Sequence, residues 1–206
     1  MYHQEAEVNG QVQVVKDRFG SRGITFNHGK GMAKWYINSS WIGQTQDFDE
    51  MKIALHRGDY KSVNLYITNL TNPNYGGICT NPWKEKTQTP DRARRLALDG
   101  CVINTQTLPG SNHPSMNMGG TAVHEIGHWF GLWHTFENML GDPNDLDPCS
   151  PTNPDDMVAD TPKMVLFEEG VCVEDDTCEG GGLDPIHNHM SYSSDACRTE
   201  FTQGQA

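Results

Sequence analysis

The chain has 206 residues and a formal net charge of −12, with 27 acidic and 15 basic residues. This balance argues against a nucleic-acid partner, because phosphates are bound by basic surfaces. No apolar run approaches the ~20 residues that span a bilayer, so we expect no membrane segment. The length suits a single domain over residues 1–206, which we expect to act as a monomer.

The N-terminal half is predicted to contain two helices and several strands. A helix over about residues 4–18 follows from apolar residues at helical spacing, namely Val8, Val12, Val15 and Phe19. A short helix capped by Asp47 would carry Phe48, Met51 and Leu55 on one side. Strands are predicted from β-branched residues and partial alternation at 23–26, 33–38, 62–68, 76–80 and 101–104.

The C-terminal half is predicted to begin with a helix over 117–131 and to continue in turns from residue 134 to 192. Ala122, Val123, Ile126 and Phe130 are the apolar residues by which that helix can pack on the structure beneath it. The six cysteines stand at 79, 101, 149, 172, 178 and 197. Their even number and the absence of a C-x-x-C pattern favour disulfides over metal binding and leave the pairing open. We expect an upper lobe of helices and strands over about 1–134, and a loop-rich lower lobe over 135–206 held by cystines.

The segment from residue 124 to 134 reads H-E-x-x-H-x-x-G-x-x-H. Residues four apart share a face of a helix, so His124 and His128 can direct two imidazoles at one metal ion. Gly131 can turn the chain with a positive φ and bring back His134 as a third nitrogen ligand. The alternative, a helix with incidental surface histidines, does not explain five specified positions.

Three histidines with an open fourth position are typical of a catalytic zinc ion rather than a structural one. Such an ion lowers the pKa of a bound water toward ~7. Glu125 is placed to accept the proton as the hydroxide attacks a peptide carbonyl, and to pass it to the leaving amine. His187 and His189 are less favoured as ligands of a second metal, because the zinc motif is already complete.

Several further motifs accompany the zinc motif, through which the chain resembles the metzincins. Met190, in Asn-His-Met-Ser-Tyr at 188–192, supplies the methionine turn that metzincins also need. The chain resembles the pappalysin branch, and its secreted fungal members in particular. The resemblance is carried by residues 51–60, Gly-His-Trp-Phe-Gly-Leu-Trp-His-Thr-Phe at 127–136, Asp-Thr-Pro at 160–162, Asp195-Ala-Cys197, Phe201-Thr202 and Gln205.

The resemblance implies an α+β metzincin-like fold, with a twisted, mostly parallel sheet, helices and the zinc helix above an irregular, disulfide-held lower lobe. It implies the zinc ligands and base named above, with Met190 in the turn beneath the metal and Tyr192 as a flexible catalytic hydroxyl. For Tyr192 the alternative is a packing role. By order of occurrence it suggests cystines 79–101, 149–178 and 172–197. It also suggests, by analogy, that residues 75–82 form the sheet edge to which an extended peptide substrate adds.

The stretch from Asp142 to Asp184 contains thirteen acidic residues and one basic residue, Lys163. Such a stretch is usually a solvated loop surface, but its oxygen atoms also suit calcium. The resemblance makes Asp156, Asp160 and Thr161 the candidate calcium ligands. For Asp160-Thr161-Pro162, a cap or turn is an equally good interpretation.

The predicted function is that of a secreted, extracellular zinc metalloendopeptidase acting on peptide or protein substrates. The first residues contain neither the basic nor the apolar part of a signal peptide. Relative to the family, the first strand of the sheet and a final helix have no counterpart here, so we expect a domain truncated at both ends. The alternative is therefore a truncated zinc-binding fragment without activity, and a zinc hydrolase of small amides has less support.

Overall fold

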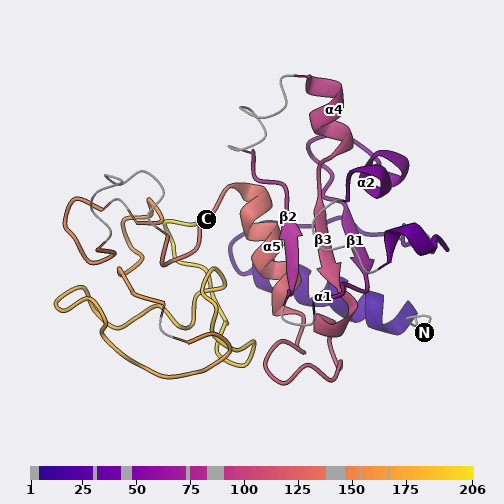
Figure 1. Cartoon of the computed structure of the whole chain (residues 1–206). Coiled ribbons are helices and arrows are strands. Elements are labelled where there is room, and N and C mark those ends of the chain that lie inside the picture. Colours follow the sequence, from indigo (N-terminus) through magenta and orange to yellow (C-terminus); the bar gives the residue numbers. More distant parts are fainter. Residues whose placement is uncertain are drawn as a thin grey trace. The chain divides into compact units, whose positions relative to one another are not determined.

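The structure is a computed structural model that describes residues 5–29, 32–42, 48–72, 75–82, 91–137, 147–153, 155–166 and 168–206 (Figure 1). The chain divides into two units, Met1–Gly131 and Leu132–Ala206, a few residues before the predicted lobe boundary. Among the described helices, none is both long and apolar enough to pass through a membrane. The expectation that residues 1–206 form one catalytic domain stays a prediction.

Helix α1 (Glu5–Gly20) forms where the apolar spacing predicts it and buries Gln11, Val15 and Phe19. It packs against helix α5 (Gly120–Phe130). The Nε2 of Gln11 donates to the carbonyl of Gly119 at 3.0 Å, so a buried amide meets the backbone just before α5 begins. The Phe19 ring lies 5.5 Å from the ring of Phe130, between centroids, at the other end of α5. Apolar and polar contacts thus fix α1 along α5.

The described sheet has three strands in the order β1-β3-β2. β1 (Leu65–Thr68) runs parallel to β3 (Cys101–Asn104), and β2 (Gly77–Cys79) runs antiparallel to it. All four residues of β3 are buried, as expected of a central strand. Cys79 lies opposite Cys101 in the register, and the two form a disulfide. The strands predicted at 62–68, 76–80 and 101–104 are confirmed, the first with a later start.

The two strands predicted at 23–26 and 33–38 are wrong. Residues 24–29 and 32–38 have no regular structure, and no strand among the described residues pairs with them. Trp35, Tyr36 and Ile37 are 50%, 48% and 84% exposed. β-branched and aromatic residues indicate a chain that could pair, but a strand forms only where a neighbouring strand satisfies its backbone groups.

The face of the sheet that carries Tyr66 and Val102 packs against helix α2 (Asp49–Leu55). Phe48, Met51 and Leu70 complete this buried cluster. Asp47, the predicted cap of α2, lies outside the described residues. Helix α4 (Arg92–Ala97) contacts α2 and is capped by Asp91, which accepts from the backbone N–H of Ala93. The described part of the unit also contains two single 3₁₀ turns, η1 (Ser39–Trp41) and η2 (Thr105–Thr107).

Two adjacent glycines bring β2 close to α5, which contacts both β2 and β3. A Cβ on Gly77 would lie 2.7 Å from the carbonyl oxygen of Val102 and 3.0 Å from the Cγ of Glu125. A Cβ on Gly76 would lie 3.1 Å from the Cγ2 of Thr121. Since backbone cannot yield as a flexible side chain does, only glycine fits at residue 77.

The unit of residues 132–206 contains no helix or strand in its described parts, which agrees with the predicted run of turns. One isolated parallel bridge joins Asn188 and Glu200. Disulfides join Cys149 to Cys178 and Cys172 to Cys197, so all three pairings implied by the resemblance are confirmed. Without ladders of backbone hydrogen bonds, this unit depends on cystines and on side chains that bind the backbone.

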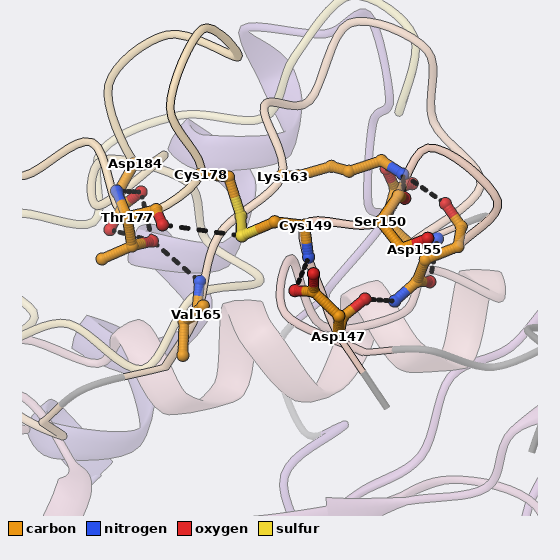
Figure 2. Close-up of a disulfide and its surroundings, with 10 residues drawn as sticks. Asp147, Cys149, Ser150, Asp155, Lys163, Val165, Thr177, Cys178 and Asp184 are labelled. Atoms are coloured by element: carbon orange, nitrogen blue, oxygen red, sulfur yellow. Dashed lines mark hydrogen bonds and ion pairs between the residues drawn. A yellow bond between two sulfur atoms is a disulfide. The ribbon is translucent and has the colours of Figure 1, made fainter. Parts of the chain in front are cut away.

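Lys163 shows how such side chains act around the Cys149–Cys178 disulfide (Figure 2). Its Nζ donates to the carbonyl of Ser150 at 2.7 Å and also to the carbonyl of Asn153, and it lies 3.9 Å from Asp155 Oδ2. The ammonium group therefore holds Ser150, Asn153 and Asp155 together through two carbonyl oxygens and one carboxylate. On the other side of the disulfide, the carboxylate of Asp184 accepts from the backbone N–H and hydroxyl of Thr177.

Replacing Gly77 by Ala should destabilise the protein by about 1–3 kcal/mol, because the added methyl group overpacks the space between β2, β3 and α5. Gly10→Ala is the matched control: its Cβ meets nothing within 4 Å, and it lies inside α1. There the same substitution should stabilise by about 0.5–1 kcal/mol. Thermal unfolding of both variants measures the difference. Equal shifts in the same direction would contradict the close approach at residue 77.

Candidate metal centre

Helical spacing brings His124 and His128 to one face of α5. Their ring centroids are 4.7 Å apart and their planes meet at 89°. The helix begins after Gly119 (φ 81°) and ends at Gly131 (φ 98°), both in the left-handed region. The Gly131 N–H donates to the carbonyls of Gly127 and His128, which closes the last turn. Glycine is needed here because an L side chain resists positive φ, so the predicted turn at Gly131 is confirmed.

The three histidines of the motif come together. Each offers one ring nitrogen, and these ligand atoms all lie within 4.8 Å of one another. His124 is buried, whereas His128 and His134 are partly exposed. Three imidazole nitrogens without a fourth protein ligand are the donor set of a catalytic zinc ion, which keeps one position for water or substrate. The residues present therefore fit zinc by the chemistry of their donors.

The surroundings of His134 fix the plane of its ring. The Nδ1 lies 3.1 Å from Oε1 of Glu137, and the backbone N–H of His134 donates to Oε2 of Glu137 at 3.2 Å. Phe136 stacks on the imidazole at 5.0 Å with an interplanar angle of 5°, and Tyr192 meets it edge-on at 4.7 Å. Phe136 and Tyr192 also touch each other, at 4.8 Å between centroids. These contacts join the third histidine to the methionine turn.

The methionine turn lies beside the residue that follows His134. The backbone N–H of Thr135 donates to the carbonyl of Met190 at 3.3 Å. Met190 is fully buried, and its own N–H donates to Oδ1 of Asn188 at 2.8 Å. Met190 lies 56 positions after His134 in the sequence, and only the family pattern predicted the proximity of the two segments.

Glu125 lies on α5 next to the first predicted ligand and is 6% exposed. Gly77 of β2 faces its Cγ, as described above, so the strand edge and the predicted base are neighbours. The pKa of Tyr75 is raised by burial and, to a smaller extent, by the negative charge of Glu125. The end of the segment 75–82 thus shares the electrostatic environment of this carboxylate.

The candidate calcium ligands are only partly brought together. Asp156 and Thr161 are buried, and Oδ2 of Asp156 and Oγ1 of Thr161 have no hydrogen-bond partner. Burial raises the pKa of Asp156 to about 7. Asp160 is exposed, and hydrogen bonds from Thr202 and from the Gly204 N–H lower the pKa of its carboxyl. The described residues contain no second group of three or more His, Cys, Asp or Glu side chains close enough to share a metal ion, His187 and His189 included.

Sequence reasoning missed Glu137 and Phe136, which hold His134. The signal was present, since both follow His134 within three positions. Outside a helix, however, that spacing does not fix which side chains meet, so the pairing could not be inferred.

Comparison with known proteins identifies relatives over the whole chain. The model of the family Peptidase_M43, described as pregnancy-associated plasma protein-A, matches residues 47–206. An extracellular metalloprotease of Pyricularia oryzae is 37% identical over 205 residues, which make up 99% of this chain and 65% of the relative. An extracellular metalloprotease of Arthroderma otae is 35% identical over 202 residues, 98% of this chain and 68% of the relative. The chain thus spans about two thirds of the length of these curated relatives.

The fold also matches solved structures. Mature mirolysin of Tannerella forsythia, solved in complex with a cleaved peptide, superposes with a TM-score of 0.72 at 25% identity, covering 98% of this chain and 82% of mirolysin. The sequence motifs, the histidine triad, the family match and this likeness of fold agree with one another. The chain therefore belongs to the pappalysin family of metallopeptidases, Peptidase_M43.

Proposed function

We propose that this chain is a zinc-dependent metalloendopeptidase that hydrolyses peptide or protein substrates. The observation that carries the proposal is the convergence of His124, His128 and His134, whose ligand atoms lie within 4.8 Å of one another. Membership of a metallopeptidase family supports it. When bound, zinc supplies a Lewis acid that activates a water and polarises the scissile carbonyl.

Glu125 acts as the general base. Its carboxylate accepts a proton from the attacking water as the new C–O bond forms at the carbonyl carbon. When the C–N bond breaks, Glu125 delivers that proton to the leaving amine nitrogen. Its burial beside β2 supports this role, because a carboxylate with few water neighbours interacts more strongly with a nearby proton donor.

Tyr192 acts as a hydrogen-bond donor to the oxygen of the tetrahedral intermediate. Support comes from its edge-on contact with the ring of His134, which brings the phenol to the third ligand. A donor aimed at developing charge is worth more in the transition state than in the ground state. The alternative role, packing against His134 and Phe136, needs the ring but not the hydroxyl.

An extended peptide would add to the edge of β2 that no strand of the described sheet occupies. This strand stands at one end of the described sheet and is antiparallel to β3, and Gly77 faces Glu125. Strand addition aligns a substrate through main-chain hydrogen bonds and leaves side-chain selection to pockets. The geometry thus directs a peptide backbone toward the proposed base.

Exchanging Glu125 for Gln should leave zinc bound at about one ion per chain and lower casein hydrolysis by about 10²–10⁴-fold, because the amide cannot accept the proton. Zinc content by mass spectrometry and hydrolysis of labelled casein measure the two quantities. Glu174→Gln is the control, since this exposed carboxylate lies in the same chain far from the motif in sequence. Activity of the Glu125 variant equal to that of the control would disprove the proposed base.

Replacing Tyr192 by Phe should lower kcat by about 10²-fold and leave KM nearly unchanged, because only the interaction made in the transition state is lost. The ring contacts with His134 and Phe136 survive in this variant. Steady-state kinetics on a peptide substrate measure both constants. An unchanged kcat would show that Tyr192 serves only in packing.

A structural calcium ion at Asp156 and Thr161 is the second part of the proposal. The buried, unpartnered oxygens of these residues support it, since a cation would satisfy both. Burial raises the pKa of Asp156 to about 7 in spite of the hydrogen bond from the Val158 N–H, and a cation would stabilise its charged form. Asp160 would take part only through the loop that its carboxylate holds at Gly204.

Calcium should raise the melting temperature of the zinc-loaded protein. When the calcium concentration is 100 times the dissociation constant, binding should stabilise the folded state by about 2.7 kcal/mol. Asp156→Asn should abolish this response, because it removes a charged ligand oxygen. Asp176→Asn, at an exposed site in the same acidic segment, should retain it. A wild-type melting temperature that calcium leaves unchanged excludes the ion.

The alternative function is a zinc-binding fragment without activity. The chain spans 65% and 68% of the length of the two relatives described above. Casein hydrolysis by the wild-type chain in the Glu125 experiment decides between the two. We further propose an extracellular monomer, supported by the names of the curated relatives and by three cystines, which persist in oxidising compartments.

A further inference from the structure

The carboxylate of Glu137 contacts His134 through both of its oxygens. Oε1 lies 3.1 Å from the ring Nδ1, and Oε2 accepts from the backbone N–H at 3.2 Å. The backbone N–H of Glu137 donates in return to the carbonyl of His134, also at 3.2 Å. One side chain therefore fixes both the position of the His134 backbone and the rotation of its ring.

This contact also determines which ring nitrogen is available to a metal. A carboxylate only accepts hydrogen bonds, so the Nδ1 of a neutral His134 must carry the proton toward Glu137. The lone pair then resides on Nε2, the other nitrogen of the ring. Ligand histidines held in this way are also more basic, which strengthens the bond to the metal.

His134 needs such a partner more than the other two histidines of the triad. His124 and His128 stand on α5, whose helical backbone fixes their spacing. His134 follows Gly131, in a stretch without helix or strand. Its orientation must therefore come from side chains, namely the stacked ring of Phe136, the edge of Tyr192 and the carboxylate of Glu137.

We propose that Glu137 is a positioning residue that holds His134 with Nε2 toward the zinc ion and thereby raises zinc affinity. The inference rests on the proposed zinc site but not on its catalytic activity. In this role Glu137 acts through the ring and backbone of His134.

The test is zinc affinity, measured by competition with a chromogenic chelator on the folded protein. Glu137→Ala should raise the zinc dissociation constant about 10- to 100-fold. Glu137→Gln keeps one acceptor oxygen of similar position and should recover part of the loss. Glu174→Ala removes an exposed carboxylate from the same unit and should bind zinc like the wild type.

Two further measurements separate positioning from general stability. In a His134→Ala background, Glu137→Ala should have no further effect on zinc affinity, since the ring through which it acts is absent. With cobalt in place of zinc, the visible absorption bands, which report ligand geometry, should change in Glu137→Ala and not in Glu174→Ala. The melting temperatures of the metal-free variants show how much stability each has lost.

Wild-type zinc affinity in Glu137→Ala would overturn the proposal. So would an equal loss in the His134→Ala background, because Glu137 would then act through the loop as a whole. Failure of the proposed function gives another result. If the protein binds zinc but hydrolyses no peptide, the proposed activity is wrong, and the difference in zinc affinity between Glu137→Ala and the wild type still tests the role of Glu137. If the wild type binds no zinc, both the proposed function and the role of Glu137 are wrong.

Discussion

The burial of α5 against β2 and β3 is the constraint from which the metal centre follows. Ala122, Val123 and Ile126 are fully buried, so the helix cannot rotate about its axis without exposing them. With the helix fixed in rotation, the face that carries His124 and His128 is fixed as well. Gly76 and Gly77 allow the close approach, and Glu125 becomes a neighbour of the sheet edge for the same reason. The packing that stabilises α5 thus also fixes the direction in which His124, His128 and Glu125 point.

His134 depends on a different principle. Beyond Gly131 the chain has no ladder of backbone hydrogen bonds in its described parts, so orientation is local and comes from side chains. An aromatic stack and a carboxylate take the place of helical geometry. Two of the three proposed ligands are therefore placed by the helix α5, while the third is oriented by Phe136, Glu137 and Tyr192 of the methionine turn.

The sequence predicted those features that depend on the periodicity of apolar residues or on the chemistry of a motif. The helices at 5–20 and 120–130 follow from apolar spacing and glycine stops, and the histidine triad follows from the motif. The segments 23–26 and 33–38 were predicted as strands and are not, because local composition does not reveal whether a partner strand is present. The cystine pairs came from family resemblance, since spacing alone left them open. Glu137 was missed because its role depends on a loop conformation that no period describes.

The acidic segment acquires a structural meaning that composition did not suggest. Read as sequence, it is a solvated loop surface, yet many of its carboxylates accept backbone N–H groups two residues on or across a loop. Such bonds replace the ladders of backbone hydrogen bonds that are absent from the described parts of this unit. The carboxylates of Asp147, Asp155, Asp156 and Asp160 accept hydrogen bonds from the backbone N–H groups of Cys149, Met157, Val158 and Gly204, respectively. Lys163 acts in the opposite sense, because its ammonium group donates hydrogen bonds to two backbone carbonyls. The negative charge of the segment therefore reflects its need for acceptors: an irregular chain that cannot satisfy its N–H groups by strand pairing satisfies them with aspartate.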